Sequence, residues 1–427
     1  MDTQSHEHPT DFPPLAKVAA ALFEITETLA CEVGAPTDQS PPWCDFEWRI
    51  ARAVAAMQGA SSLLYAGLRW KGAESWRRFL EEQRDHVSAR HRKIEQLLDR
   101  IDSHARSEGI ALVALKGAEL HRLGIYRAGE RPMADVDLLV RETDVNATTR
   151  LLKDCGYALT FTKWRHHVFE SGLTGLPNVA CFGEHVDSPI KIELHTSIRE
   201  RLPVSETDIT QFVFPSGAHA GLNGYPSAAS LMMHLLLHAA GNMRANALRL
   251  IQLHDIARLA TRFSPSDWEE LLRSRPGDQG LWWALAPLVL TVRYCRTTVP
   301  PSVIARLGEE CPWFLRWVSR RQCLGEVSWS NLRVDAFPGI EWSRTPLEAL
   351  RYMISRIWPS RETRSDLKRF AVHHPGAAGV PWYGISQGAR MLRWAFSKPP
   401  RVQALLPVRA ALAQRYDDAA RGDPAEL

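Results

Sequence analysis

Residues 115–140 read LKGAELHRLGIYRAGERPMADVDLLV, and the short apolar run at the end of this stretch predicts a β-strand. Side chains alternate between the two faces of a strand, so Asp135 and Asp137 point the same way. Val136 and Leu138 point the other way, toward a core. Two like charges held side by side repel, and a fold tolerates them best where a cation neutralises them. The alternative interpretation is a turn capped by Asp135 and a solvated Asp137.

A second stretch, PIKIELH at residues 189–195, alternates strictly between apolar and polar residues and also predicts a strand. Its isoleucines and its leucine share one face. The other face carries Lys191, Glu193 and His195. If this strand lies beside the first, Glu193 adds a third carboxylate to the same surface. Three converging oxygen donors are the ligands that Mg²⁺ prefers, with water and substrate phosphates completing the coordination.

The pair Lys116-Gly117 sits between a predicted strand at 110–115 and a predicted helix at 118–126. A glycine here lets the backbone approach a ligand closely, and the start of the helix offers free N–H groups to an anion. Lys116 or Arg131 would pair with phosphate oxygens; a surface ion pair is the alternative for each. A phosphate cradle beside a carboxylate metal site is the equipment for phosphoryl or nucleotidyl transfer.

The rest of the chain predicts an α+β fold, in which a small mixed sheet is flanked by helical regions. Residues 1–105 form a mainly helical N-terminal region, with helices expected at 16–33, 45–70 and 74–107. Residues 106–215 form the α/β core, with a helix at 143–155 and a strand or hairpin at 157–170 besides the elements above. Residues 216–427 form a helical C-terminal region, with helices at 227–241, 244–262, 267–274 and 281–296.

Length and composition exclude several classes of protein. The 427 residues are 45% hydrophobic and 23% charged with a net charge of +4, so the chain is neither disordered nor a dedicated nucleic-acid binder. Seven cysteines without a CxxC pair argue against a disulfide framework or a zinc ribbon. The N-terminus lacks a secretory signal, and the longest apolar run, 281–292, is too short to span a bilayer. We therefore expect a soluble, cytoplasmic protein without a transmembrane segment.

The two quoted stretches together resemble the DNA polymerase β-type nucleotidyltransferase superfamily. In particular they resemble a bacterial subset described only as uncharacterised nucleotidyltransferases, some of which accompany peptide natural-product clusters. The resemblance is clear over residues 110–200 and weaker over 234–260, where HLLLHAA and LIQLHDIARL look like the helical region of that subset. It implies a small mixed sheet backed by helices. It also implies transfer of a nucleoside monophosphate from an NTP, with release of pyrophosphate.

By this resemblance, Gly117 matches the nucleotide-loop glycine, Asp135 and Asp137 match the metal pair, and Glu193 matches the third carboxylate. The implied cofactor is Mg²⁺ or Mn²⁺, and ATP is the expected donor. The acceptor would be a small molecule, a peptide or a protein hydroxyl, and no stable nucleic-acid complex is expected. The superfamily usually has Gly-Ser in the loop, whereas this chain has Gly117-Ala118 and lacks the hydroxyl contact to phosphate. Lys116 would compensate; the alternative is an inactive scaffold that binds a nucleotide or a partner.

Several further residues are candidates for substrate contacts, with a role in the structural core as the alternative for each: His195, His167, His238 and Asp255. His234 and His238 also have the i, i+4 spacing of zinc ligands, which leaves a metal hydrolase as a third hypothesis. The intervening LLL lacks the glutamate of HExxH, so a zincin is not expected. Basic and aromatic residues alternate at 351–370, where they either grip an acidic partner or cover a helical core with their stems.

Overall fold

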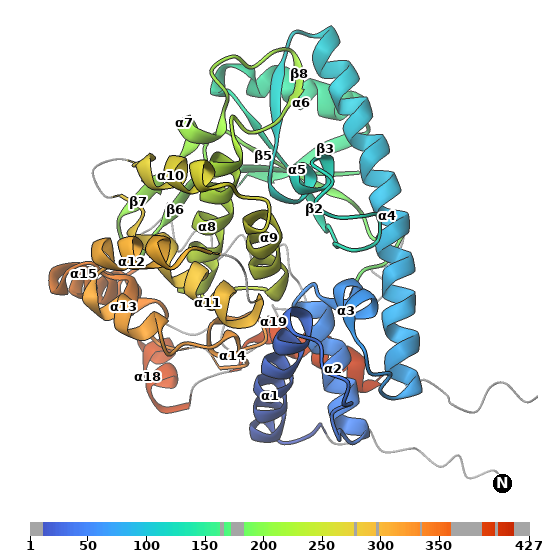
Figure 1. Ribbon diagram of the computed structural model, residues 1–427, viewed down its shortest axis with the longest axis vertical. Coiled ribbons are helices and arrows are strands. Elements are labelled where there is room, and N and C mark those ends of the chain that lie inside the picture. Colours follow the sequence, from blue (N-terminus) through green and yellow to red (C-terminus); the bar gives the residue numbers. More distant parts are fainter. Residues whose placement is uncertain are drawn as a thin grey trace, which may run out of the picture.

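The computed structural model describes residues 12–162, 166–171, 183–276, 280–295, 299–333, 335–359, 387–397 and 400–413. The N-terminal region is helical, as expected, and consists of α1 (Leu15–Gly34), α2 (Asp45–Met57), α3 (Ser61–Gly67) and α4 (Glu74–Ser107). The helix expected over 45–70 is divided in two because Gly59 has a φ of +63°, which a right-handed helix does not allow. In Figure 1, α4 is the long helix that runs along one side of the molecule.

A six-stranded mixed sheet forms the α/β core, in the strand order β3-β4-β5-β2-β1-β8. Its strands are β1 (Ala111–Ala114), β2 (Asp135–Val140), β3 (Tyr157–Thr162), β4 (His166–Ser171), β5 (Lys191–His195) and β8 (Gly221–Asn223). The central strands β2 and β5 run parallel, and β4 runs antiparallel to β5. The links between strands include α5 (Lys116–Arg122), the 3₁₀ turn η1 (Glu142–Asp144) and α6 (Val145–Asp154). The predicted α+β class is confirmed.

The two faces of the sheet differ in what covers them. On one face, Val136, Leu138 and Ile192 are fully buried in a cluster with Leu97 of α4 and Leu151 of α6. The opposite face turns toward the helices that follow the sheet in the chain, and the acidic side chains of β2 and β5 lie on it. This division follows the alternation in the sequence, because the apolar residues of each strand take the face that a helix covers.

Helices dominate the chain after the sheet. The nearest to it are α8 (Ala228–Arg244) and α9 (Leu250–Ala260), which lie at the centre of Figure 1. The following elements are α10 (Pro265–Arg273), η3 (Trp282–Ala284), α11 (Leu285–Cys295), α12 (Pro301–Glu310), α13 (Trp313–Ser319), α14 (Leu324–Val327), η4 (Ile340–Trp342), α15 (Pro346–Ile357), α18 (Gln387–Ser397) and α19 (Val402–Ala413). Residues 360–370 of the basic and aromatic stretch lie outside the described residues.

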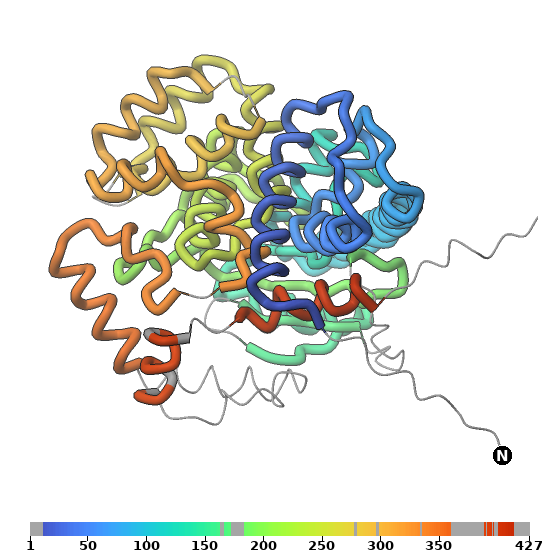
Figure 2. The backbone as a smooth tube through the Cα atoms, turned by 90° about the horizontal axis from the view of Figure 1, so that it is seen from below, coloured from blue at the N-terminus to red at the C-terminus, as the bar shows by residue number. Residues whose placement is uncertain are grey.

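The two ends of the described chain pack together. Helix α19 lies against α2, where Arg49 donates to the carbonyl of Leu412 at 3.0 Å. Figure 2 shows α19 in red beside the blue N-terminal helices. One apolar cluster contains residues of α1, α2, α8, α9, α11 and α19. Packing therefore crosses both boundaries of the three-part division predicted at 105 and 215, since α4 also belongs to the buried layer of the sheet.

The shortest elements were absent from the sequence prediction. Strand β8 and the two-stranded sheet of β6 (Arg199–Arg201) and β7 (Glu206–Asp208) are each built of three-residue strands, and the four-residue helix α7 (Thr210–Val213) follows them. Three residues are too few to display an alternating pattern. Strand β8 is instead held by pairing with β1 and by Asp102 of α4, whose carboxylate accepts from the Leu222 N–H at 2.6 Å.

Within the described residues, no helix has the length and apolar character that crossing a bilayer requires. Each of the six cysteines among these residues is a free thiol.

Ile192 tests how strongly the buried layer holds the central strands. Its side chain is fully buried between β5 and the covering helices. We expect Ile192→Ala to lower the free energy of unfolding by about 2–5 kcal/mol, because it leaves a cavity that the sheet cannot close. Leu159→Ala on β3 is the control, because Leu159 is 47% exposed and should cost far less. Denaturant unfolding of both variants would measure the difference; equal losses would contradict this account of the core.

Candidate functional site

The predicted acidic residues meet at the paired strands β2 and β5. Asp137 lies directly opposite Glu193 in the parallel register, and Asp135 lies opposite Lys191. Asp137 is buried, whereas Asp135, at the first position of its strand, is exposed. The pairing thus places Asp137 and Glu193 side by side on the face that looks toward α8 and α9, with Asp135 one pleat away on the same face.

Asp137 has two side-chain partners, an ion pair with Lys116 and a hydrogen bond with His195. Lys116 Nζ lies 2.9 Å from its Oδ1, and His195 Nε2 lies 3.0 Å from the same oxygen. Burial alone would raise the pKa of Asp137, but the Lys116 ammonium and the His195 hydrogen bond hold it well below its usual range. Burial likewise works against the charge of Lys116, yet the neighbouring Asp137 and Asp135 raise the pKa of Lys116. The pair is therefore ionised at neutral pH.

Asp135 has no such partner among the described residues, and its pKa shifts in the opposite direction. The surrounding protein removes part of its hydration, and the negative charge of Asp137 adds to this effect, so the pKa of Asp135 rises to about 6. Loss of hydration would also raise the pKa of Glu193, but the nearby His166 lowers it. Three carboxyl groups in one corner thus carry more negative charge than the single Lys116 ammonium neutralises. The corner favours a second cation.

The backbone of Lys116 is itself unusual. Its φ is +45°, in the left-handed region that residues other than glycine rarely adopt, at a cost on the order of 1–3 kcal/mol. Its N–H donates to Tyr225 Oη at 3.1 Å, and Tyr225 in turn bonds to His234 Nδ1 at 2.6 Å. This chain of contacts holds the loop in a conformation that aims the Lys116 side chain at Asp137. His234 is a buried support of the loop, and within the described residues no group of three metal-ligating side chains includes His234 or His238.

Gly117 and Ala118 form the first turn of α5, which has only seven residues. A Cβ atom at position 117 would collide with the guanidinium of Arg131. The glycine thus makes room for a side chain of the protein itself, whereas the sequence interpretation reserved that space for a ligand. Ala118 is buried, so its methyl group packs where the superfamily's usual serine would present a hydroxyl.

Arg131 forms a buried ion pair with Asp255. Its Nε and Nη2 lie 2.8 and 2.7 Å from the two carboxylate oxygens of Asp255, and Tyr126 donates to the same carboxylate at 2.9 Å. Burial would lower the pKa of Arg131, but Asp255 raises it above its ordinary value. Both residues line the cavity wall. Because the guanidinium fork is already engaged, Arg131 is a weaker candidate for phosphate binding than the sequence suggested.

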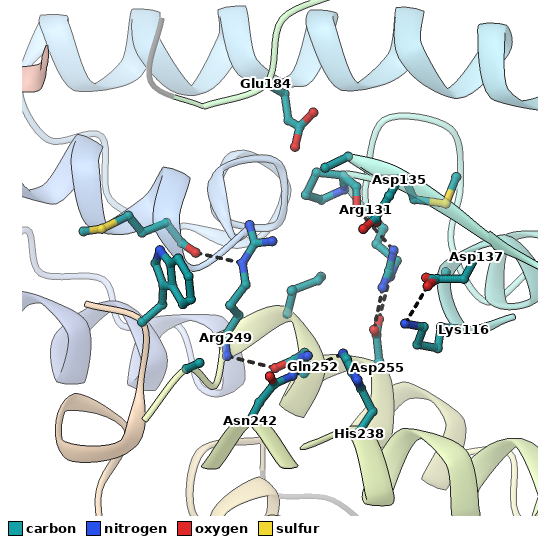
Figure 3. A pocket seen from close by; sticks show the side chains of 18 of the residues that line it. Lys116, Arg131, Asp135, Asp137, Glu184, His238, Asn242, Arg249, Gln252 and Asp255 are labelled. Carbon is teal, nitrogen blue, oxygen red and sulfur yellow. Dashed lines mark hydrogen bonds and ion pairs between the residues drawn. The ribbon is translucent and has the colours of Figure 1, made fainter. Parts of the chain in front are cut away.

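A cavity of about 540 Å³ lies between the acidic strands, the loop at 116–118 and the helices α8 and α9. Figure 3 shows Asp135, Asp137 and Lys116 on one side of it and Arg249 on the other. His238 also lines the cavity, where its Nε2 lies 3.2 Å from the side-chain amide of Asn242. A volume of this size accommodates a small ligand of nucleotide dimensions.

Arg249 is a site residue that sequence reasoning missed. Its Nε donates to the carbonyl of Met57 at 2.8 Å, which anchors the guanidinium at the cavity wall. No carboxylate lies within ion-pair distance of it among the described residues, and the nearby Glu184 is paired with Arg90 at 3.1 Å. Burial lowers the pKa of Arg249, as expected for a cation without a counter-ion. The one sequence signal that could have indicated Arg249 is its position directly before LIQLHDIARL, at the start of α9.

The histidines of the sheet divide between its faces. His195 lies beside Asp137, as described above, and burial lowers the pKa of His195 despite that carboxylate. His166 is paired with His195 across β4 and β5, and its Nε2 lies 3.3 Å from Glu193 Oε2. His167, the predicted substrate contact, instead contacts Thr162 at 3.0 Å. Strand alternation thus directs His166 toward the acidic corner and turns His167 away from it.

Residues 45–291 match the family described as "Uncharacterised nucleotidyltransferase", and this range is more than half of the chain. The chain belongs to this family. No curated protein and no solved structure matches it. The matched range contains the acidic strands, the loop at 116–118 and Arg249.

The buried ion pair between Arg131 and Asp255 yields a stability prediction for this family member. Asp255→Ala leaves the Arg131 guanidinium buried without a counter-charge, and we expect a loss of about 3–5 kcal/mol in the free energy of unfolding. The double variant Arg131→Met with Asp255→Leu should recover most of that loss, because no unpaired charge remains. Denaturant unfolding measures both. A double variant no more stable than Asp255→Ala would show that the ion pair is not the source of the loss.

Proposed function

We propose that this protein transfers a nucleoside monophosphate from an NTP, with ATP as the expected donor, to a hydroxyl-bearing acceptor in a reaction that requires a divalent cation. The family indicates nucleotidyl transfer in general. The observation that carries the finer proposal is the register of β2 and β5, in which Asp137 and Glu193 lie side by side with Asp135 on the same face, next to the cavity. A place in the DNA polymerase β-type superfamily belongs to the same proposal.

The acidic corner fits a hard divalent cation such as Mg²⁺ or Mn²⁺. Loss of hydration and the neighbouring Asp137 charge raise the pKa of Asp135 to about 6, and the Lys116 ammonium, itself a cation, already contacts Asp137. Asp135, Asp137 and Glu193 would hold the ion through their oxygens. When bound, it would neutralise charge on the reacting phosphate and on the attacking oxygen.

Lys116 and Arg249 would bind the triphosphate from opposite sides of the cavity. Both are positively charged and both line the cavity. Lys116 is a compact point charge, while the guanidinium of Arg249 matches two phosphate oxygens at once. Ala118 supplies no hydroxyl, so the contact that the superfamily makes with serine would pass to Lys116. The loop at 116–118, with Gly117 in its first turn, would border the phosphates.

In the proposed reaction the acceptor oxygen bonds to the α-phosphorus while the bond from that phosphorus to the bridging oxygen of the β-phosphate breaks. Pyrophosphate leaves with the bond electrons, and the hydroxyl proton passes to Glu193 as general base. His195 would orient Asp137 through their 3.0 Å hydrogen bond, and His238 would contact the substrate from α8. The ion pair of Arg131 and Asp255 would keep their part of the cavity wall rigid.

The acceptor would enter from the side of the cavity that the two ends of the chain build. Met57 from α2, Trp329, and Pro407 from α19 line it there. A small molecule, a peptide or a protein side chain fits this opening, and a role in natural-product biosynthesis follows only from the resemblance. Use of an NTP accords with a cytoplasmic location.

A second candidate is an inactive member of the family that binds a nucleotide or a partner. Ala118 in place of serine and the close contact of Lys116 with Asp137 favour it. The two candidates differ in one product, because only the enzyme releases pyrophosphate.

Asp137→Asn tests the proposed chemistry. Incubation with labelled NTP, Mg²⁺ or Mn²⁺ and candidate acceptors should give pyrophosphate release with the unmodified protein. We expect the variant to lose about 100-fold or more of that rate, because it removes a fixed charge at the reacting centre. Asp154→Asn, at the exposed end of α6, is the control and should leave the rate unchanged. Equal rates for both variants would remove the proposal, and nucleotide binding without pyrophosphate release would favour the inactive alternative.

Arg249→Met tests the triphosphate contact independently of turnover. We expect the affinity for ATP to fall about 10- to 100-fold, since a hydrogen-bonded charge pair contributes about 1.5–3 kcal/mol. The variant breaks no ion pair among the described residues, and loss of the hydrogen bond to the Met57 carbonyl should cost the folded state only about 0.5–1.5 kcal/mol. Arg262→Met is the matched control, because Arg262 is an exposed arginine in the turn that follows α9. Isothermal titration with ATP and Mg²⁺ checks both; unchanged affinity in Arg249→Met would exclude this residue from the nucleotide site.

A further inference from the structure

Two histidines lie beside the acidic corner and introduce nitrogen atoms into it. His166 of β4 and His195 of β5 are register partners on neighbouring strands, and their ring centroids are 4.9 Å apart. One ligand atom each from His166, Glu193 and His195 lie within 4.8 Å of one another. Within the described residues, this is the group of three that comes close enough to hold a metal ion.

The distances centre on Glu193. Its Oε2 lies 3.3 Å from His166 Nε2 and 3.9 Å from His195 Nε2. His195 Nε2 is also 3.0 Å from Asp137 Oδ1, so a fourth ligand stands at the edge of the group. Two imidazoles and one carboxylate from two adjacent strands therefore surround one small volume, and Asp137 of β2 lies beside it, next to His195. The rigid pairing of the strands, and not a loop, sets this arrangement.

His166 lacks the contacts that a buried histidine normally makes. Its side chain is only 12% exposed, yet among the described residues neither of its ring nitrogens has a hydrogen-bond partner. The 3.3 Å approach to Glu193 has the distance of an ion pair without the angles of a hydrogen bond. A buried polar group left without a partner costs on the order of 1–3 kcal/mol. A metal ion that accepts the lone pair of a His166 ring nitrogen would remove that cost for this nitrogen.

We propose that His166, Glu193 and His195, with Asp137 beside them, bind a first-row divalent transition ion such as Zn²⁺ or Mn²⁺. Imidazole nitrogen binds these ions more readily than it binds Mg²⁺, which prefers oxygen ligands. The site shares Glu193 and Asp137 with the proposed catalytic centre, so the inference deepens the proposed function. It would make the ion at the Glu193 end of that centre a transition metal. Binding itself does not depend on turnover.

The first test uses the full unmodified chain without nucleotide. Co²⁺ titration followed by visible absorption should show saturable binding of one ion, and pulsed electron paramagnetic resonance of the Mn²⁺-loaded protein should show coupling to histidine ¹⁴N. Excess Mg²⁺ should not displace Co²⁺. Manganese coordinated by oxygen alone, or Co²⁺ displaced by Mg²⁺ at comparable concentrations, would overturn the proposal. This test needs no variant and so does not depend on how a variant folds.

The second test compares neighbours on one strand. We expect His166→Ala to weaken Co²⁺ binding about tenfold or more, as losses at metal sites commonly do. His167→Ala is the matched control, since His167 points away from the corner and should leave binding unchanged. Equal affinities in the two variants would overturn the proposal. Co²⁺ binding without nucleotidyl transfer would contradict the proposed function and leave the metal site intact. Mg²⁺-dependent transfer by a protein whose bound metal has no nitrogen ligand would contradict the metal site and leave the proposed function intact.

Discussion

The parallel pairing of β2 with β5 is the constraint on which the site depends. It places Asp137 opposite Glu193 and leaves both on the face that turns toward α8 and α9, where they line the cavity. The same register buries Val136 and Ile192 on the other face, so the apolar layer and the acidic corner are two sides of one pairing. A slip of one residue would exchange the two faces, burying carboxylates and exposing the core. The free energy gained by burying the apolar residues thus fixes the register, and the register fixes the position of the carboxylates.

Charge repulsion is the cost of this arrangement, and the protein offsets it only in part. Lys116 neutralises Asp137 and is held in a strained left-handed conformation while it does so. Asp135 keeps a raised pKa, and Arg249 on the far wall is half-buried without a partner carboxylate among the described residues. Unbalanced negative charge on one side of a cavity and unbalanced positive charge on the other are what a site for a metal ion and a polyphosphate requires.

The acidic residues could be predicted from the sequence because both strands that carry them show a clear alternation of apolar and polar residues. The period of two put Asp135 and Asp137 on one face and Glu193 on the matching face, without any long-range information. Arg249 and His166 could not be predicted in this way. Arg249 reaches the cavity only because α9 packs against the loop after α2, nearly 200 residues earlier in the chain. The sequence interpretation chose His167 where the structure places its neighbour His166 beside Glu193. The pattern did not define the edges of the β3–β4 hairpin, and so it did not show which of the two histidines lies on the acidic face.

The packing of α4 and α19 illustrates the same physical limit. Alternation and helical spacing report local structure, whereas the partners of α4 and α19 are set by surfaces far away in the sequence. As a result, α4 completes the buried layer of the sheet, and α19 closes the cavity through Pro407 although it lies 270 residues after Asp137. Trp329 and Pro407 also lie beyond the range that matches the family. The acidic strands, the loop at 116–118 and Arg249 thus lie within the range that the family covers, whereas Trp329 and Pro407 come from the C-terminal part of this chain.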